Sequence, residues 1–150
     1  MPDSPAIPIA NVSIITLGVE NLTESTRFYE KLGWINTVAS QNSVTFLQGD
    51  SVVLGLYGRQ ALAEDAAVDN TPAGFRGVTL ARNFASETDV DAYFELAISA
   101  GAEAIKKPEQ VFWGGYSGYF ADLDGHLWEI AHNPFFQQTP SGQLSLERKG

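Results

Sequence analysis

The stretch GYFADLDGHLWEIAHNP, residues 118–134, decides the fold of this chain. It contains two strand-forming runs joined by Asp124-Gly125, a dipeptide typical of tight hairpin turns. Within the second run, Glu129 lies between apolar residues that favour a strand, where a buried charge is costly. An acid at this point of a strand therefore requires a partner or an open cleft.

The chain as a whole shows one pattern of elements twice, and the quoted stretch ends the second copy. The first copy has a strand at 12–19, a helix in TESTRFYEKLG (23–33) and strand-like runs at 34–39, 43–48 and 51–57. The second copy has a strand at 75–82, a helix that ends at Gly101, and strands at 102–106, 116–122 and 126–132. Asn21 with Glu24, and Ser86 with Asp89, are spaced as capping boxes for the two helices.

Two copies of one unit, neither able to cover its own sheet, predict sheets that complete one another. We therefore expect an α+β fold of two tandem βαβββ modules, residues 11–57 and 75–132, around a shared concave cleft. A linker at 58–74 joins the modules, and a polar tail at 135–150 follows them. The whole chain, 1–150, has the length of a single domain.

Strand alternation predicts which side chains face the cleft. In the last strand, Trp128 and Ile130 are the natural pair to pack on the helix. The same alternation turns Leu127, Glu129 and Ala131 towards the cleft. The pattern itself therefore predicts that Glu129 points inward.

The paired modules, the stretch LGVENLTESTRFYEKLGW (17–34) and the ending GYFADLDGHLWEIAHNP together resemble the vicinal oxygen chelate superfamily. That superfamily covers glyoxalase I, extradiol dioxygenases, and bleomycin and fosfomycin resistance proteins. The resemblance runs from about Asn11 to Pro134. The usual D-P-D-G turn is D-L-D-G here (122–125), and its Asp and Gly residues keep the turn chemistry.

The resemblance implies up to four metal-binding positions, one in the first strand and one in the last strand of each module. Glu129 occupies the last-strand position of the second module. An overlay of Phe46 on Phe120 puts Gly55 at the matching position of the first module. The first-strand patterns put Ile14 and Gly77 at the other two positions.

Ile14, Gly55 and Gly77 have no side-chain donor, and a catalytic divalent ion needs about three protein donors. We therefore predict that the chain keeps the fold, binds no metal and needs no cofactor. His132 has the opposite strand parity to Glu129, and His126 begins the last strand, so neither histidine is expected to complete the site.

Three roles remain open for Glu129: an anchor for a cationic or hydrogen-bond-donating ligand, a metal-free general base or acid, or a carboxylate satisfied by Arg76, Arg82 or a tyrosine hydroxyl. As a catalytic group it is a candidate only. The predicted ligand-binding residues combine this acid with aromatic side chains near the cleft: Glu129, Phe112, Trp113, Tyr116 and Tyr57.

Composition restricts the partners. A net charge of −9 with nine Lys and Arg residues argues against nucleic acid. The absence of cysteine excludes disulfides and thiolate chemistry. No apolar run is long enough for a membrane span, and Met1 to Ala10 does not resemble an export signal, so we expect a cytoplasmic protein that does not engage a membrane.

These observations predict a metal-independent protein that sequesters an aromatic or cationic small molecule, as the bleomycin-resistance members do. The alternative is an enzyme, a glyoxalase-like lyase or isomerase or an extradiol-type dioxygenase, that uses a bound divalent metal. The resemblance also implies a homodimer.

Overall fold

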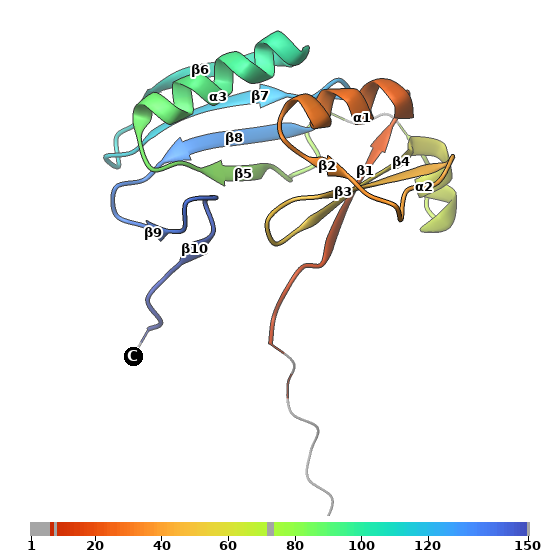
Figure 1. Cartoon of the computed structure of the whole chain (residues 1–150), viewed down its shortest axis with the longest axis horizontal. Helices are drawn as coiled ribbons and strands as arrows, with labels where there is room; N and C mark the ends of the chain where they lie inside the picture. Colours follow the sequence, from red (N-terminus) through yellow and green to blue (C-terminus); the bar gives the residue numbers. More distant parts are fainter. Residues whose placement is uncertain (1–6, 8, 72–73, 150) are drawn as a thin grey trace, which may run out of the picture.

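The computed structural model describes residue 7 and residues 9–71 and 74–149. The remaining parts of the predicted single domain lie outside the described residues, including 72 and 73 of the linker and Gly150 of the tail. Two four-stranded sheets carry helices on one side, with a short hairpin on the other (Figure 1). The α+β class and the tandem βαβββ arrangement are confirmed.

The first module contains β1 (Ile14–Val19), α1 (Leu22–Lys31), β2 (Ile35–Asn36), β3 (Val44–Gln48) and β4 (Val53–Gly58). Its strands lie in the order β1-β4-β3-β2, with β1 parallel to β4 and the other pairs antiparallel. The Asn21 side chain accepts a 3.0 Å hydrogen bond from the Glu24 amide, which starts α1 as the capping box predicts.

The second module repeats this topology. It contains β5 (Leu80–Asn83), α3 (Glu87–Ala100), β6 (Glu103–Gln110), β7 (Tyr116–Ala121) and β8 (Leu127–His132), with the strands in the order β5-β8-β7-β6. Ser86 Oγ accepts from the Asp89 amide at 3.1 Å and caps α3. Gly101, at φ 117°, ends the helix in the left-handed conformation that favours glycine.

Two predicted strands keep half or less of their predicted length. The run predicted at 34–39 pairs as a strand only over Ile35–Asn36. The strand predicted at 75–82 begins at Leu80, because Gly77 has φ +79° and interrupts the extended backbone.

The predicted linker contains a helix, α2 (Arg59–Asp65), whose sequence RQALAED is rich in good helix formers. This helix packs where β1 ends: a Cβ added to Gly18 would lie 3.2 Å from Arg59 Cα. Glycine at position 18 therefore allows the close approach of α2 to the strand.

The predicted tail forms a second unexpected element, the hairpin of β9 (Gln137–Gln138) and β10 (Leu144–Ser145), which lies below β5 in Figure 1. Ser141 Oγ in its turn donates to Asp50 Oδ2 of the first module at 2.5 Å. Gly142 approaches β5 so closely that a Cβ would lie 2.4 Å from Asn83 O. The tail therefore contacts both modules.

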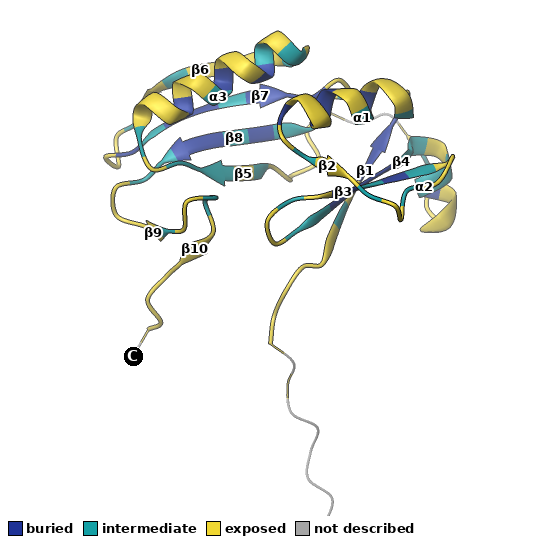
Figure 2. Cartoon of the chain, viewed as in Figure 1, coloured by how far each residue is buried: buried dark blue, intermediate teal, exposed yellow. Residues whose placement is uncertain are grey.

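One apolar core joins the two modules. Its buried side chains come from both sheets and from α1 and α3. Figure 2 shows buried residues, in dark blue, in these elements. Leu47, Leu54 and Leu56 of the first module share this core with Phe120 and Ile130 of the second, and each of these five is fully buried.

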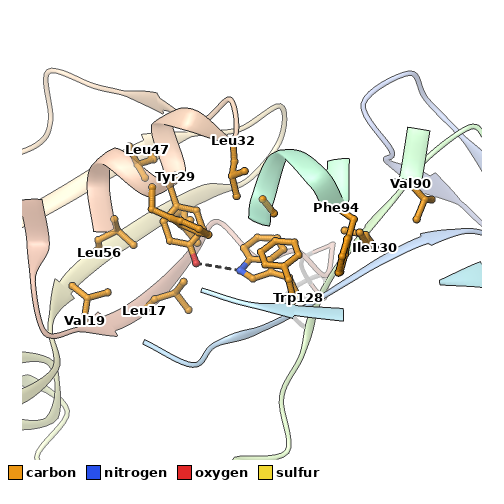
Figure 3. Close-up of a cluster of buried hydrophobic side chains, with 14 residues drawn as sticks. Leu17, Val19, Tyr29, Leu32, Leu47, Leu56, Val90, Phe94, Trp128 and Ile130 are labelled. Carbon is orange, nitrogen blue, oxygen red and sulfur yellow. Dashed lines mark hydrogen bonds between the residues drawn. The ribbon is translucent and has the colours of Figure 1, made fainter. Parts of the chain in front are cut away.

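Within this core, hydrogen bonds between polar side chains connect the two modules. Tyr29 Oη of α1 donates to Asp122 Oδ2 at 2.5 Å. It also accepts from Trp128 Nε1 at 3.1 Å (Figure 3). Asp122 Oδ1 accepts from the amides of Asp124 and His126. Burial raises the pKa of the Asp122 carboxyl, and the Tyr29 hydrogen bond opposes that rise. The D-L-D-G turn thus fixes the second module to α1.

Candidate functional site

A hollow of about 380 Å³ lies on the face of the second sheet away from α3. This volume is within the range of small-molecule sites. Its floor is formed by Ser117 and Tyr119 of β7 and Glu129 of β8, and β6 supplies Lys106, Glu109 and Gln110 at its side. Val111, Phe112 and Trp113 from the loop between β6 and β7 complete the wall. We call this hollow the cavity; its lining residues all belong to the second module.

Strand register places Glu129 as alternation predicts. Trp128 and Ile130, its neighbours in β8, are buried against the helix side of the sheet, so Glu129 points to the opposite face. Tyr119 lies directly across from it in β7 and donates its hydroxyl to Glu129 Oε2 at 3.3 Å. Desolvation, and then the Glu129 charge, raises the pKa of Tyr119, so its hydroxyl keeps its proton.

The structure selects among the internal partners predicted for Glu129. Arg82 faces the other side of the sheet, where its guanidinium lies 4.9 Å from the Phe84 ring centroid and 5.2 Å from that of Tyr93. Arg76 Nη2 donates to Thr71 O at 3.1 Å. The tyrosine hydroxyl is the partner that the structure provides, and no salt bridge to Glu129 occurs among the described residues.

The loop that carries the aromatic wall is closed by two backbone hydrogen bonds, from the Val111 amide to Gly115 O and from the Gly114 amide to Val111 O. The Trp113 ring folds back over Gly115 so closely that a Cβ there would lie 1.8 Å from it. Phe112 is fully exposed at the loop tip. Both residues line the cavity with Glu129, so the structure brings these three predicted ligand-binding residues together.

Tyr116 and Tyr57, the other two predicted ligand-binding residues, lie elsewhere. Tyr116 has the parity of Phe120 and faces α3, where its hydroxyl donates to Asp91 Oδ1 at 2.7 Å. That hydrogen bond raises the pKa of Tyr116 to about 12. Tyr57 lies on β4 of the first module, outside the cavity lining. Alternation along β7 could have placed Tyr116 correctly.

Sequence reasoning missed five polar cavity residues: Lys106, Glu109, Gln110, Ser117 and Tyr119. Lys106 Nζ lies 3.4 Å from Glu109 Oε1, and both side chains are largely exposed. Ser117 and Tyr119 have the same strand parity as each other and pair with Ala131 and Glu129. Their positions opposite the β8 residues already assigned to the cleft were the available signal.

The overlay of the two modules needs one correction. Phe120 faces α3 in the core, whereas Phe46 pairs with Gly55 on the opposite face, so Phe120 corresponds to the buried Leu47 instead. Gly55 keeps its assignment, because Leu54 and Leu56 on either side of it are buried as Trp128 and Ile130 are.

The first-strand position of the second module also moves. The helix caps Asn21 and Ser86 occupy equivalent positions in the two modules. The same offset makes Thr79 the equivalent of Ile14, and Gly77 lies further upstream. The four positions are then Ile14, Gly55, Thr79 and Glu129. One carboxylate and one neutral hydroxyl do not make a divalent metal site.

The two histidines likewise lie at other contacts. His126 Nε2 is 2.8 Å from Gly18 O, and His132 Nδ1 is 2.9 Å from Phe84 O. Within residues 7, 9–71 and 74–149, no cluster of three or more His, Cys, Asp or Glu side chains is placed to hold a metal ion. The residues present do not fit the metal that the resemblance implies for metal-dependent relatives.

Paired βαβββ modules with a hollow on the sheet face away from the helices define the class of this protein. The chain belongs to the Glyoxalase/Bleomycin resistance protein/Dioxygenase superfamily, whose family model matches residues 11–130. Among solved structures, it is similar to a glyoxalase-related enzyme from Fulvimarina pelagi, with 35% identity and a TM-score of 0.81 over 93% of this chain and 100% of that one.

More distant structures share the fold. A glyoxalase/bleomycin resistance protein/dioxygenase family enzyme from Burkholderia phytofirmans PsJN aligns with a TM-score of 0.74 at 18% identity, over 82% of this chain and 98% of that one. An uncharacterized protein of Mycobacterium bovis is 44% identical over 43 residues, which are 29% of this chain. The match spans 28% of the length of that curated relative.

Among the described residues, no helix is both long enough and apolar enough to cross a bilayer.

Proposed function

We propose that this protein is a metal-independent small-molecule-binding protein that holds an aromatic or cationic ligand in the cavity. The observation that carries the proposal is Glu129, a carboxylate on the cavity floor whose described protein partner is a neutral tyrosine hydroxyl. Trp113 and Phe112 offer aromatic surface beside it. A carboxylate next to aromatic rings favours an organic cation, through charge pairing and cation–π attraction.

The charge of the cavity wall supports this choice. Glu109 and Glu129 contribute two negative charges and Lys106 one positive charge, which leaves one net negative charge. Lys106 is already paired with Glu109. An anionic ligand would therefore meet Glu129 without a free cation to offset the repulsion.

The test is a binding titration of the full chain, followed by tryptophan fluorescence. The probes are benzylammonium, neutral benzyl alcohol and anionic benzoate. We expect the cation to bind most tightly and benzoate most weakly, with the preference lost in Glu129→Gln and kept in Glu103→Gln, a matched exposed acid on β6. Equal binding of all three probes by the unmodified protein would contradict the proposal.

The alternative function is an enzyme, a glyoxalase-like lyase or isomerase or an extradiol-type dioxygenase with a bound divalent metal. It is favoured by the 35% identity to a structure described as a glyoxalase-related enzyme. Metal analysis of the purified protein separates the two functions. Stoichiometric Zn, Ni, Mn or Fe, with probe binding that chelation abolishes, would replace our proposal with this one.

We also propose a homodimer. Large apolar side chains are exposed at the start of β1 and before β5: Ile14 at 47%, Phe75 at 72% and Val78 at 65%. Exposed apolar surface of this kind is typical of protein interfaces. Light scattering of the protein as it elutes from a size-exclusion column should give a molar mass twice the 16.2 kDa of the chain. A monomer at micromolar concentration would refute the proposed homodimer. A cytoplasmic location and the absence of a nucleic-acid partner stay predictions of the sequence.

A further inference from the structure

Three of the donor groups around the cavity already have one partner each. Gln110 Nε2 donates at 2.7 Å to Glu87 Oε2, and Glu87 is not one of the cavity-lining residues. Tyr119 Oη donates to Glu129 Oε2 at 3.3 Å. Lys106 Nζ is paired with Glu109 Oε1 at 3.4 Å. The Trp113 indole carries one further N–H donor.

The acceptors, by contrast, are available. Within the described part of the chain, Glu129 Oε1 accepts no hydrogen bond, and an ionised carboxylate offers about four lone-pair sites. Ser117 lines the same floor at 4% exposure, and its hydroxyl can accept a hydrogen bond as well as donate one. The cavity floor is therefore dominated by groups that accept hydrogen bonds.

We infer that the cavity selects organic cations whose charged group carries N–H donors, such as a primary ammonium, amidinium or guanidinium on a flat apolar body, over quaternary ammonium ions. This inference rests on the proposed function and deepens it. A quaternary ion satisfies the charge of Glu129 but donates nothing. It would strip water from Glu129 and Ser117 without replacing the lost hydrogen bonds, and buried acceptors left without a donor are costly.

The N–H groups of a primary ammonium suit the floor in number as well as in charge. Its three donors can serve Glu129 Oε1 and Ser117 Oγ and leave one for water. The apolar body then lies against Trp113, whose ring lies over Gly115. From the value of a charged hydrogen bond, we expect a preference of about tenfold to a hundredfold over the quaternary ion.

The experiment is a series of probes that differ in N–H count: benzylammonium, N,N-dimethylbenzylammonium and benzyltrimethylammonium, with neopentylbenzene as the neutral probe of quaternary shape. Each is titrated into the full chain at neutral pH by ligand-observed NMR. We expect affinity to fall along the series and the trend to flatten in both Glu129→Gln and Ser117→Ala. Glu103→Gln, outside the cavity, should keep the trend.

The outcomes separate this inference from the proposed function. If the quaternary ion binds as tightly as benzylammonium, and both bind more weakly to Glu129→Gln, the donor inference is wrong and the cation site stands. If the cations bind no tighter than neopentylbenzene, both are wrong. A trend that persists unchanged in both cavity variants also overturns the inference, because it would arise away from Glu129 and Ser117.

Discussion

Replacement of Tyr29 by phenylalanine should destabilise the protein by breaking the contact between the modules. The variant keeps the ring and removes one hydroxyl that donates to Asp122 Oδ2 at 2.5 Å and accepts from Trp128 Nε1 at 3.1 Å. Both partners are buried, at 5% and 8% exposure. A buried polar group left without its partner costs about 1–3 kcal/mol, so we expect a loss of roughly 2–4 kcal/mol in the free energy of unfolding.

This loss should depend on pH with a definite sign. Burial raises the pKa of Asp122 above its usual 3.8. The folded state therefore holds this proton more tightly than the unfolded chain, and the contribution of Asp122 to stability falls as pH rises from 3.8 through the folded pKa. The Tyr29 hydrogen bond lowers that pKa, so its removal raises the pKa further. The deficit of Tyr29→Phe should grow as pH rises through this window.

Urea denaturation at several pH values, followed by circular dichroism, measures the deficit. Tyr116→Phe is the matched control, because it removes a hydroxyl that binds Asp91 on the surface, and it should change stability by less than about 0.5 kcal/mol. A deficit for Tyr29→Phe below about 1 kcal/mol, or one that shrinks as pH rises, would refute the reasoning.

Two glycine substitutions test the close contacts, each against Gly74→Ala, where an added Cβ meets nothing within 4 Å. Gly115→Ala would put a methyl group 1.8 Å from the Trp113 ring, so we expect that ring to leave its position. Tryptophan emission should change, and benzylammonium should bind at least tenfold more weakly. Unchanged emission would show that the contact does not hold the ring. Gly142→Ala combines a φ of +89° with a Cβ 2.4 Å from Asn83 O, so the melting temperature should fall by several degrees. A Tm equal to that of Gly74→Ala would mean that the hairpin does not pack on β5.

Strand alternation and helix capping carried most of the fold prediction. The inward direction of Glu129 and the caps at Asn21 and Ser86 depend on neighbours within a few residues, and the structure has all three as expected. The same rule, applied along β7, would have put Tyr116 beside Phe120 on the helix side. Its assignment to the cleft followed the crowding of aromatic residues instead of the parity of the strand.

Other features depended on contacts that no local pattern encodes. The Arg59–Asp65 helix has suitable propensities but no apolar stripe, and its place is set by its approach to Gly18. The hairpin of β9 and β10 has strands of two residues, too short for a periodic signal, and it is held by the distant Asp50 and Asn83. Tertiary contacts decide such segments, so their sequences alone did not predict them.

The indole rings of Trp34 and Trp128 come from different modules, and their centroids are 6.3 Å apart at an interplanar angle of 62°. Two indole rings at this distance and with this large an interplanar angle couple their electronic transitions. The coupling should give the folded chain an exciton couplet in its ultraviolet circular dichroism. That signal requires the two halves of the molecule to be docked, whereas each half could keep its helix and strands without it. The protein thus carries an internal optical reporter of the association of its halves, independent of any label.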